Sequence, residues 1–282
     1  MSYSHSQTHS RPLPLVCTAL LAALALASGC ASKSEPQPVS RGLTRITETG
    51  ELRVGMSGEQ PPLNMTARNG ELIGMEVALV NVLAQTMGVR AVLVKAPFGQ
   101  LLDRLDAGQV DIVMSGMTIT PERSTRVAMV GPYYTSGKSL LTKSEALAAM
   151  QLPDDLNSSR LRFAALKGST SEDFVRRSLP KAKLELAERL EDGIRMVMDS
   201  EVDGLVADQE TGHFAVLRHP EAGLHTSTAN FTIEPMGIAV PLNQPHLANL
   251  LQSYLTALSN TGTLTKVREF WFKDPSWVKD LR

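Results

Sequence analysis

The stretch at residues 110–123 reads V-D-I-V-M-S-G-M-T-I-T-P-E-R, and it combines an apolar run, a hydroxyl-rich turn and a helix start. The β-branched residues of Val110–Met114 favour a buried strand. Pro121 suits the first position of a helix, and Thr120 before it is a good N-cap. We therefore expect free backbone N–H groups, hydroxyls and the positive end of a helix dipole at one point. Arg123 adds a guanidinium that matches a carboxylate, so the stretch predicts either an anion site or a capped surface helix with a solvated arginine.

Length and composition narrow the possible functions. The chain has 282 residues, a formal net charge of −1 at pH 7, 43% hydrophobic and 20% charged residues, which suits two lobes or one large domain. The near-neutral charge and the lack of a basic stripe argue against nucleic-acid binding. Both cysteines, Cys17 and Cys30, fall in the first thirty residues. His5 and His9 are four apart but lie in the predicted leader, and the four histidines beyond it lack zinc-site spacing. We expect no disulfide in the folded part, no metal and no cofactor.

The N-terminus has the features of a targeting segment. The apolar run Leu13–Ala27 is 15 residues long, shorter than the ~20 that span a bilayer, so residues 1–29 are predicted to be a signal peptide. The run ends in L-A-S-G-C, which resembles a bacterial lipobox and predicts lipidation of Cys30. The alternative is an ordinary signal peptide cleaved nearby, with Cys30 incidental. Residues 30–40 are rich in Ser and Pro and are predicted to be a tether, which would place the protein in the periplasm on a membrane anchor.

Strand and helix patterns alternate along the rest of the chain. The second half repeats the pattern of the first, with a strand at Leu161–Leu166 followed by a turn at Gly168–Asp173 that opens a helix. Thr170 with Asp173 three residues on approximates a capping box. A further buried strand ends at Asp208. This alternation predicts an α/β fold in which ligands bind at the carboxyl ends of the strands, where both turns and Asp208 lie.

The order of motifs from about Gly50 to Phe272 resembles the family 3 solute-binding proteins, the bacterial amino-acid receptors of ABC importers. The motifs that match are Gly50–Gly55, Pro62–Leu63, Gly74–Val77, Phe98 with Leu101, Asp111, Ser115–Arg123, Gly131–Tyr134, Gly168–Thr170 and Val202–Asp208. The resemblance implies a two-lobed type II periplasmic-binding-protein fold, in which each lobe has a mixed, mostly parallel sheet flanked by helices and two crossover strands join the lobes. Lobe 1 would comprise 41–136 and 236–282, and lobe 2 would comprise 137–235.

The resemblance also implies a clamp for the zwitterion of an amino acid. Arg123 would pair with the α-carboxylate, assisted by Gly116 and Thr118. Thr170 would donate to the same carboxylate from the other lobe, and Asp208 would accept from the α-ammonium group. Because opposite charges would come from two lobes, ligand binding would favour the closed state. For Thr170 and Asp208, helix capping is the alternative or additional role.

The first loop departs from the family pattern. Gln60 stands where the family has an aromatic shelf, so only Phe98 remains of the usual aromatic pair. Ser57 stands at the position of an aspartate that often contacts the ligand's side chain, although Glu59 is close by. We expect these positions to contact the ligand and the clamp to be kept, with altered side-chain recognition. A polar or small side chain is favoured, and the particular amino acid stays open.

Three functions compete at this stage. The first is a lipid-anchored, monomeric receptor, not an enzyme, that delivers an amino acid to the permease of an ABC importer. The second is a periplasmic cyclohexadienyl dehydratase, which would act on prephenate or arogenate on the same fold. Glu172 stands at the place of that enzyme's general acid, but an acidic residue in the first helical turn also suits the helix dipole. The third is a sensory or scaffold lipoprotein with an altered pocket. The sequence favours the receptor.

Overall fold

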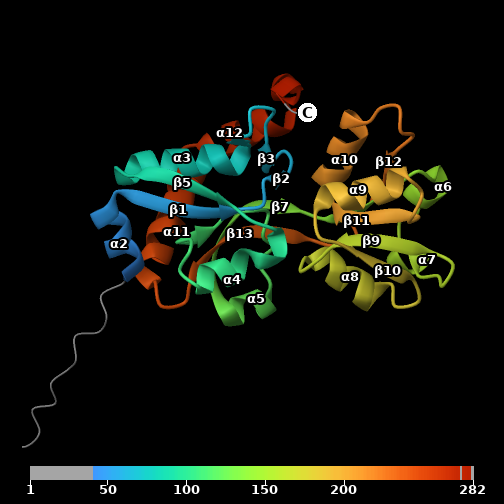
Figure 1. Ribbon diagram of the computed structural model, residues 1–282, viewed down its shortest axis with the longest axis horizontal. Coiled ribbons are helices and arrows are strands. Elements are labelled where there is room, and N and C mark those ends of the chain that lie inside the picture. Colours follow the sequence, from blue (N-terminus) through green and yellow to red (C-terminus); the bar gives the residue numbers. More distant parts are fainter. Residues whose placement is uncertain (1–40, 274, 281–282) are drawn as a thin grey trace, which may run out of the picture. The chain divides into compact units, whose positions relative to one another are not determined.

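Two five-stranded sheets organise the chain, and each belongs to its own lobe (Figure 1). The computed structural model describes residues 41–273 and 275–280. The predicted signal peptide, the tether and Cys30 lie outside these residues. Within the described part, none of the helices combines the length and hydropathy that a membrane-spanning segment needs.

Lobe 1 is built from two separate pieces of the chain. Its elements are α2 (Arg41–Thr49), β1 (Glu51–Met56), β2 (Glu59–Gln60), β3 (Asn64–Thr66), β4 (Leu72–Ile73), α3 (Met75–Met87), β5 (Arg90–Lys95), η1 (Phe98–Gln100), α4 (Leu101–Asp106), β6 (Ile112–Val113), α5 (Pro121–Arg126), β7 (Val127–Ser136), β13 (Glu234–Pro241), α11 (Pro245–Asn260), α12 (Thr263–Lys273) and η2 (Pro275–Asp280). The main sheet has the order β5-β1-β6-β13-β7, in which β5, β1 and β6 are parallel and β13 is antiparallel to both of its neighbours.

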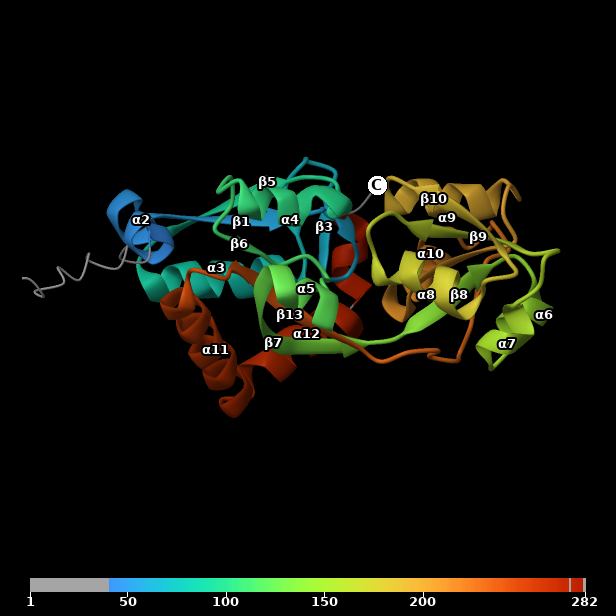
Figure 2. The same cartoon turned by 90° about the horizontal axis from the view of Figure 1, so that it is seen from below.

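The main sheet of lobe 1 is covered on both faces. Alternate residues of β1, Leu52 and Val54 among them, pack with α3 and α11 in one core, because successive side chains of a strand point to opposite faces. The other face packs against α4, where Leu101 lies close behind Gly55. Figure 2 shows α3 and α11 on one side of this sheet and α4 on the other. Gly88 ends α3 in the left-handed conformation, with φ of 68°, which glycine adopts without steric cost.

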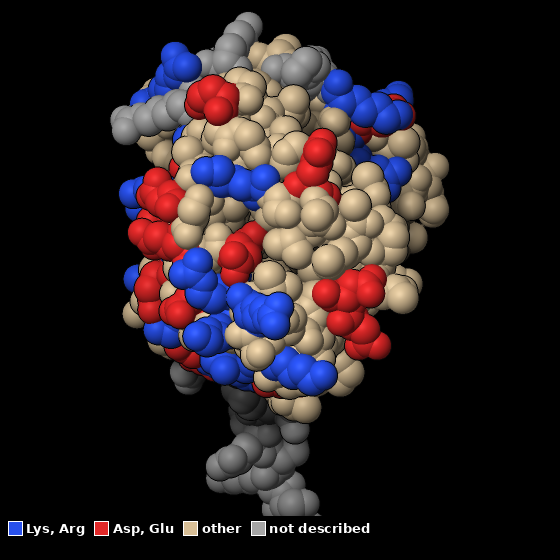
Figure 3. Space-filling model, turned by 90° about the vertical axis from the view of Figure 1, so that its right-hand side faces the viewer, with Lys and Arg blue, Asp and Glu red and all other residues tan. Residues whose placement is uncertain are grey.

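Lobe 2 is a continuous piece of chain. Its elements are β8 (Lys138–Thr142), α6 (Glu145–Ala148), α7 (Pro153–Leu156), β9 (Arg162–Leu166), α8 (Thr170–Ser178), β10 (Lys183–Ala187), α9 (Leu190–Met198), β11 (Gly204–Asp208), α10 (Gln209–Arg218) and β12 (His225–Thr226). The sheet order is β10-β9-β11-β8-β12, with β10, β9 and β11 parallel and β8 antiparallel. Phe163 and Ala165 of β9 face α8, whereas Ala164 between them faces α9 and α10. The face of lobe 2 seen in Figure 3 carries both basic and acidic side chains.

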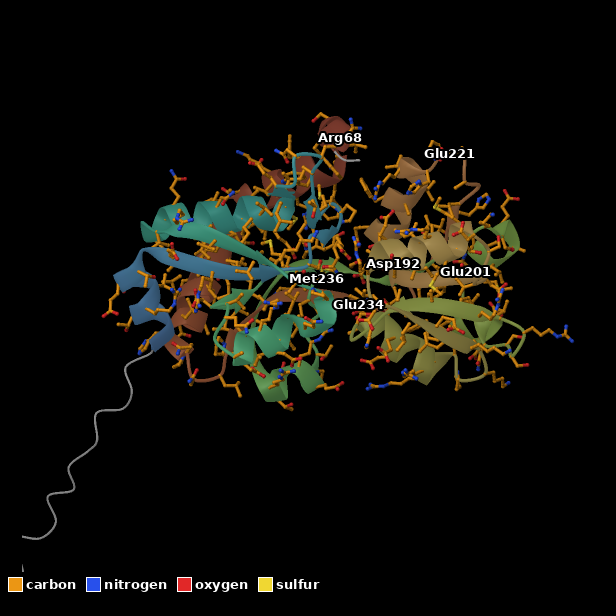
Figure 4. The ribbon with its side chains drawn as sticks, in the orientation of Figure 1. Arg68, Asp192, Glu201, Glu221, Glu234 and Met236 are labelled. Carbon is orange, nitrogen blue, oxygen red and sulfur yellow. The ribbon has the colours of Figure 1, made fainter. Side chains whose placement is uncertain are left out.

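Two antiparallel segments connect the lobes. Strand β7 ends at Ser136 in the first sheet, and β8 begins two residues later in the second. The chain returns at Glu234, the first residue of β13, which pairs with Ser136. Figure 4 shows Glu234 and Met236 at the end of β13 that lies nearest to lobe 2. The two-lobed α/β architecture with two crossover strands is therefore confirmed.

Candidate ligand-binding site

The end of the 110–123 stretch folds as predicted. Thr120 caps α5, because its hydroxyl accepts from the Arg123 N–H at 3.1 Å, and Pro121 occupies the first helical position. The strand before the turn is shorter than predicted, since only Ile112–Val113 pair with β1 as a regular strand. The helix is also short, six residues, and ends where β7 begins. Arg123 is thereby placed at the cleft edge of lobe 1.

The N–H groups of the turn are not all free, and the expectation of free donors is wrong at two positions. The N–H of Gly116 donates to the Glu76 carboxylate at 2.6 Å, and the N–H of Ile119 donates to the Pro235 carbonyl at 2.7 Å. Glu76 lies fully buried on α3 and also accepts from the hydroxyl of Tyr133. Burial raises the pKa of Glu76, and its hydrogen bonds oppose that rise. The turn is therefore held from inside lobe 1.

Arg123 is a cation without an anionic partner among the described residues. Its guanidinium donates to the carbonyl of Thr118 at 2.9 Å and, across the cleft, to the carbonyl of Gly168 at 3.3 Å. It also lies over the ring of Phe98, 5.7 Å from the centroid. Burial lowers the pKa of Arg123, and nearby acidic groups oppose this shift, but arginine stays protonated at physiological pH. The positive charge is available to an anion that enters the cleft.

The cap of α8 corrects one prediction. Ser169 is the N-cap, and its hydroxyl accepts from the N–H groups two and three residues further on. The capping box of Thr170 with Asp173 is therefore wrong, because the helix begins at Thr170 itself, one residue earlier than that pattern requires. Thr170 is left to face the cleft, where its hydroxyl donates to Glu234 at 3.0 Å and lies 3.3 Å from the hydroxyl of Thr118. Two predicted site residues from opposite lobes are thus in direct contact.

Asp208 has a partner that the sequence did not suggest. It stands at the N-cap position of α10, but its side chain makes no capping hydrogen bond, so the capping alternative is wrong. Instead, its carboxylate accepts from Nζ of Lys138 at 2.5 Å. Lys138 is only 2% exposed and also lies 3.6 Å from a carboxylate oxygen of Glu234. Burial raises the pKa of Glu234, but Lys138 and neighbouring hydroxyls outweigh it, so the pKa is lowered.

These groups enclose a small cavity between the lobes. Six of the predicted site residues line it, namely Gln60, Phe98, Gly116, Thr118, Thr170 and Asp208. Its volume of about 20 Å³ is room for roughly one water molecule. An amino acid can enter only if the lobes separate. Arg123 contacts the edge of this site, whereas Ser57 lies buried in lobe 1, where its hydroxyl donates to Asn64 at 3.1 Å.

A larger cavity adjoins the small one. It measures about 360 Å³, and the two cavities share Leu190 and Thr211 in their walls. Glu59 from lobe 1 and Arg189 from lobe 2 form an ion pair of 2.7 Å in its wall. Basic and acidic side chains both contribute to the lining, with apolar side chains between them.

Glu172 does not line either of these cavities. Its carboxylate accepts from the N–H of Gly168 at 2.9 Å and from the guanidinium of Arg176 at 3.0 Å. A general acid must reach the ligand that it protonates, and Glu172 lines neither cavity. Within residues 41–273 and 275–280, no group of three or more His, Cys, Asp or Glu side chains is arranged to hold a metal ion.

Comparisons with known proteins agree with this architecture. The family model of the bacterial extracellular solute-binding proteins, family 3, matches residues 52–274. The ABC transporter arginine-binding protein 1 of Escherichia coli (strain K12) is 24% identical over 225 residues, which cover 79% of this chain and 90% of the relative. The cyclohexadienyl dehydratase of Pseudomonas aeruginosa is 24% identical over 259 residues, 92% of each chain. The crystal structure of an ancestral amino acid-binding protein, a precursor of cyclohexadienyl dehydratase, has 32% identity and a TM-score of 0.74 and covers 82% of this chain and 99% of its own.

Proposed function

The chain belongs to the bacterial extracellular solute-binding proteins of family 3, and on this premise we propose that it captures an amino acid between its lobes and delivers it to an ABC importer. The observation that carries the proposal is Arg123, a cleft cation that lacks a carboxylate partner among the described residues. A planar guanidinium is the side chain best matched to a ligand carboxylate. Thr118 and Thr170 add hydroxyls from opposite lobes to the same place.

The charges around the small cavity fit a zwitterion. Arg123 and Lys138 are positive, while Asp208 and Glu234 are negative, so a ligand without net charge at its main-chain end keeps the balance. We assign the α-carboxylate to Arg123 and the α-ammonium group to Asp208. Because Arg123 is on lobe 1 and Asp208 on lobe 2, a ligand that contacts both favours the closed arrangement.

We assign the ligand's side chain to the larger cavity. Its mixed lining of charged and apolar groups supports a polar side chain. Gln60 and Phe98 border the small cavity and are the proposed contacts nearest to the ligand's Cα. Ser57 donates to Asn64 within lobe 1, so its proposed role is to position the first loop for ligand binding.

Calorimetry with a panel of L-amino acids tests the receptor function directly. We expect at least one amino acid to bind the wild-type protein, and we expect Arg123→Ala to weaken its binding about 30-fold or more, as for truncation of one partner in a buried charge pair. Arg126→Ala is the matched control, since Arg126 lies on the same helix but pairs with Asp103 and Asp106 outside the cleft. Binding of no amino acid, or equal effects of the two substitutions, contradicts the proposal.

Lipid attachment to Cys30 is part of the proposed receptor and is tested separately. The motif L-A-S-G-C at 26–30 supports it. Cells grown with labelled palmitate would incorporate label into the wild-type protein. In the Cys30→Ser variant, we expect the label to be lost and the protein to move from the membrane fraction to the soluble fraction. If the Cys30→Ser variant still incorporates the label, the proposal that Cys30 carries the lipid is wrong.

A dehydratase activity is the competing proposal, since one relative at 24% identity is a cyclohexadienyl dehydratase. The ion pair of Glu172 with Arg176 and its position outside the cavity walls weigh against Glu172 as a general acid. We therefore expect no product when prephenate is incubated with the purified protein and the reaction is followed by absorbance. If the wild-type protein converts prephenate and Glu172→Gln abolishes this conversion, the protein is a dehydratase and the receptor proposal is wrong.

A further inference from the structure

We infer that Lys138 competes with the ligand's ammonium group for Asp208, and that Glu234 takes over Lys138 when a ligand binds. This inference rests on the proposed function, since it concerns the same zwitterion site. It makes Lys138 a residue that sets affinity and amine selectivity.

The pairing of Lys138 with Asp208 follows from sheet register. The two residues face each other directly across the antiparallel strands β8 and β11, where opposite charges attract. The ammonium group lies 2.5 Å from Asp208, which is the group expected to bind the ligand's own ammonium group. Lys138 therefore places a lysine ammonium where an amino-acid ligand would place its own.

Two ammonium groups on one buried carboxylate repel each other strongly, because few water molecules screen them. A ligand with an α-ammonium group must therefore displace Lys138 or share Asp208 with it at a loss of affinity. A 2-hydroxy acid of the same shape brings no charge to this position and meets no such competition. Lys138 thus reduces the preference for an amine over a hydroxyl.

Glu234 offers the displaced lysine a second carboxylate nearby. Its closest oxygen is already 3.6 Å from the ammonium group, and the lysine side chain rotates about four carbon–carbon bonds. Thr170 and Thr232 donate to Glu234 and fix its carboxylate in place. Glu234 begins β13, at the edge of lobe 2 in Figure 4, so the shift moves the lysine from a pair within lobe 2 to one that joins both sheets.

Lys138→Met tests the competition with matched ligand pairs. The probes are L-alanine with L-lactate, L-aspartate with L-malate, and L-arginine with L-argininic acid, each titrated into wild type and variant by calorimetry. For the pair that binds, we expect the amino acid to bind about tenfold or more tightly to the variant. We expect the affinity for the hydroxy acid to change less than threefold. Lys143→Met is the control, because it removes the same charge just beyond the far end of β8.

Two further variants keep the test decisive. Lys138→Gln retains a polar partner for Asp208 and replaces Lys138→Met if that variant does not fold. Glu234→Gln leaves the displaced lysine without a carboxylate, so we expect weaker binding of the amino acid and unchanged binding of the hydroxy acid. If both members of a pair lose affinity equally in the Lys138 variants, or neither changes, the inference is overturned while the receptor function stands. If no probe and no other L-amino acid binds wild type or any variant, the receptor function itself fails.

Discussion

The two sides of the cleft differ in how their charges are satisfied. On lobe 1, Arg123 donates only to carbonyl oxygens and lacks a carboxylate partner among the described residues. On lobe 2, Asp208 already holds the buried ammonium group of Lys138. An unpaired charge can bind a ligand group of opposite charge directly. A paired charge can bind such a group only when the ligand replaces the present partner. The proposed carboxylate end of the site is therefore open, and the proposed ammonium end is occupied by Lys138.

The two sides are also supported differently. The lobe 1 turn is fixed from behind by Glu76, whose carboxylate accepts from the N–H of Gly116 inside the core. The lobe 2 side consists of strand ends and the first turn of α8, and Ser169 caps that helix. Lobe 1 thus presents a turn fixed by its own core, whereas the lobe 2 side is fixed by strand pairing and by a helix cap.

The largest expected difference is in stability. Asp208→Ala leaves Lys138 buried with only Glu234 at 3.6 Å, so we expect a loss of about 3 kcal/mol in the free energy of unfolding. Arg123→Ala removes no ion pair with a described carboxylate and is expected to cost less than about 1 kcal/mol, although we expect it to weaken ligand binding about 30-fold or more. Urea denaturation followed by circular dichroism measures both. Equal losses of unfolding free energy in the two variants would contradict the difference in pairing between Asp208 and Arg123.

Much of lobe 1 was predictable because its signals are local. The cap at Thr120 and the proline after it each act within a few residues, and both are found as predicted. The two-lobed fold was recognised from the order of such motifs along the chain. The proposed role of Arg123 also began from local chemistry, a charged fork beside a helix start.

The ion pair at the proposed ammonium end was not predictable in the same way. The pair of Lys138 and Asp208 joins residues 70 positions apart, and only the register of two strands brings them together. The one available signal was a lysine that opens an otherwise apolar strand pattern. The prediction of the cap of α8 failed for another reason. Ser169 and Thr170 are both good N-cap residues, and the neighbouring sequence alone does not decide at which of them the helix begins.

The pH dependence of stability should have opposite signs for two buried glutamates. Burial raises the pKa of Glu76 above its ordinary 4.5. The contribution of Glu76 to the stability of the folded state is therefore complete below pH 4.5 and is lost as the pH rises through the folded-state pKa. Burial also raises the pKa of Glu234, but Lys138 and neighbouring hydroxyls outweigh burial and lower it. The contribution of Glu234 to the stability of the folded state is therefore present above pH 4.5 and is lost as the pH falls through the folded-state pKa. We expect Glu76→Gln to gain relative stability as pH rises and Glu234→Gln to lose it. Urea titrations between pH 3 and 8 measure both slopes, and slopes of one sign would refute the contrast.

Glycine substitutions separate strain within a lobe from contact between lobes. Gly116, Gly168 and Gly108 have φ of 57°, 73° and 67°, so alanine at each costs about 1 kcal/mol in backbone strain. A Cβ at Gly168 would also lie 3.1 Å from Cα of Gly99 in lobe 1, whereas nothing lies near one at Gly108. We expect all three variants to lose similar stability.

Only Gly168→Ala is expected to disturb closure, because its new methyl group meets the opposite lobe. Calorimetry should then show ligand affinity reduced about fivefold, the equivalent of roughly 1 kcal/mol. Gly108→Ala should bind as wild type does. Gly116→Ala is the intermediate case, since its Cβ would press on the flexible end of Gln60 at 2.8 Å within lobe 1. Unchanged affinity of Gly168→Ala would mean that Gly99 and Gly168 do not meet in the ligand-bound state.

The smallest effect is expected from the ion pair of Glu59 and Arg189, which joins the lobes at the wall of the larger cavity. The side chain of Arg189 is 54% exposed and that of Glu59 is 18% exposed, so the pair contributes at most about 1 kcal/mol to closure. Arg189→Ala should weaken ligand binding no more than about fivefold at low salt, and less at 1 M salt, where the Debye length is about 3 Å. The swapped double variant Glu59→Arg with Arg189→Glu should recover most of the loss. If the ligand's side chain instead binds Glu59 or Arg189 directly, the swapped variant should restore the contact between the lobes but not the affinity for the ligand. The swapped variant therefore distinguishes a contact between lobes from a contact with the ligand.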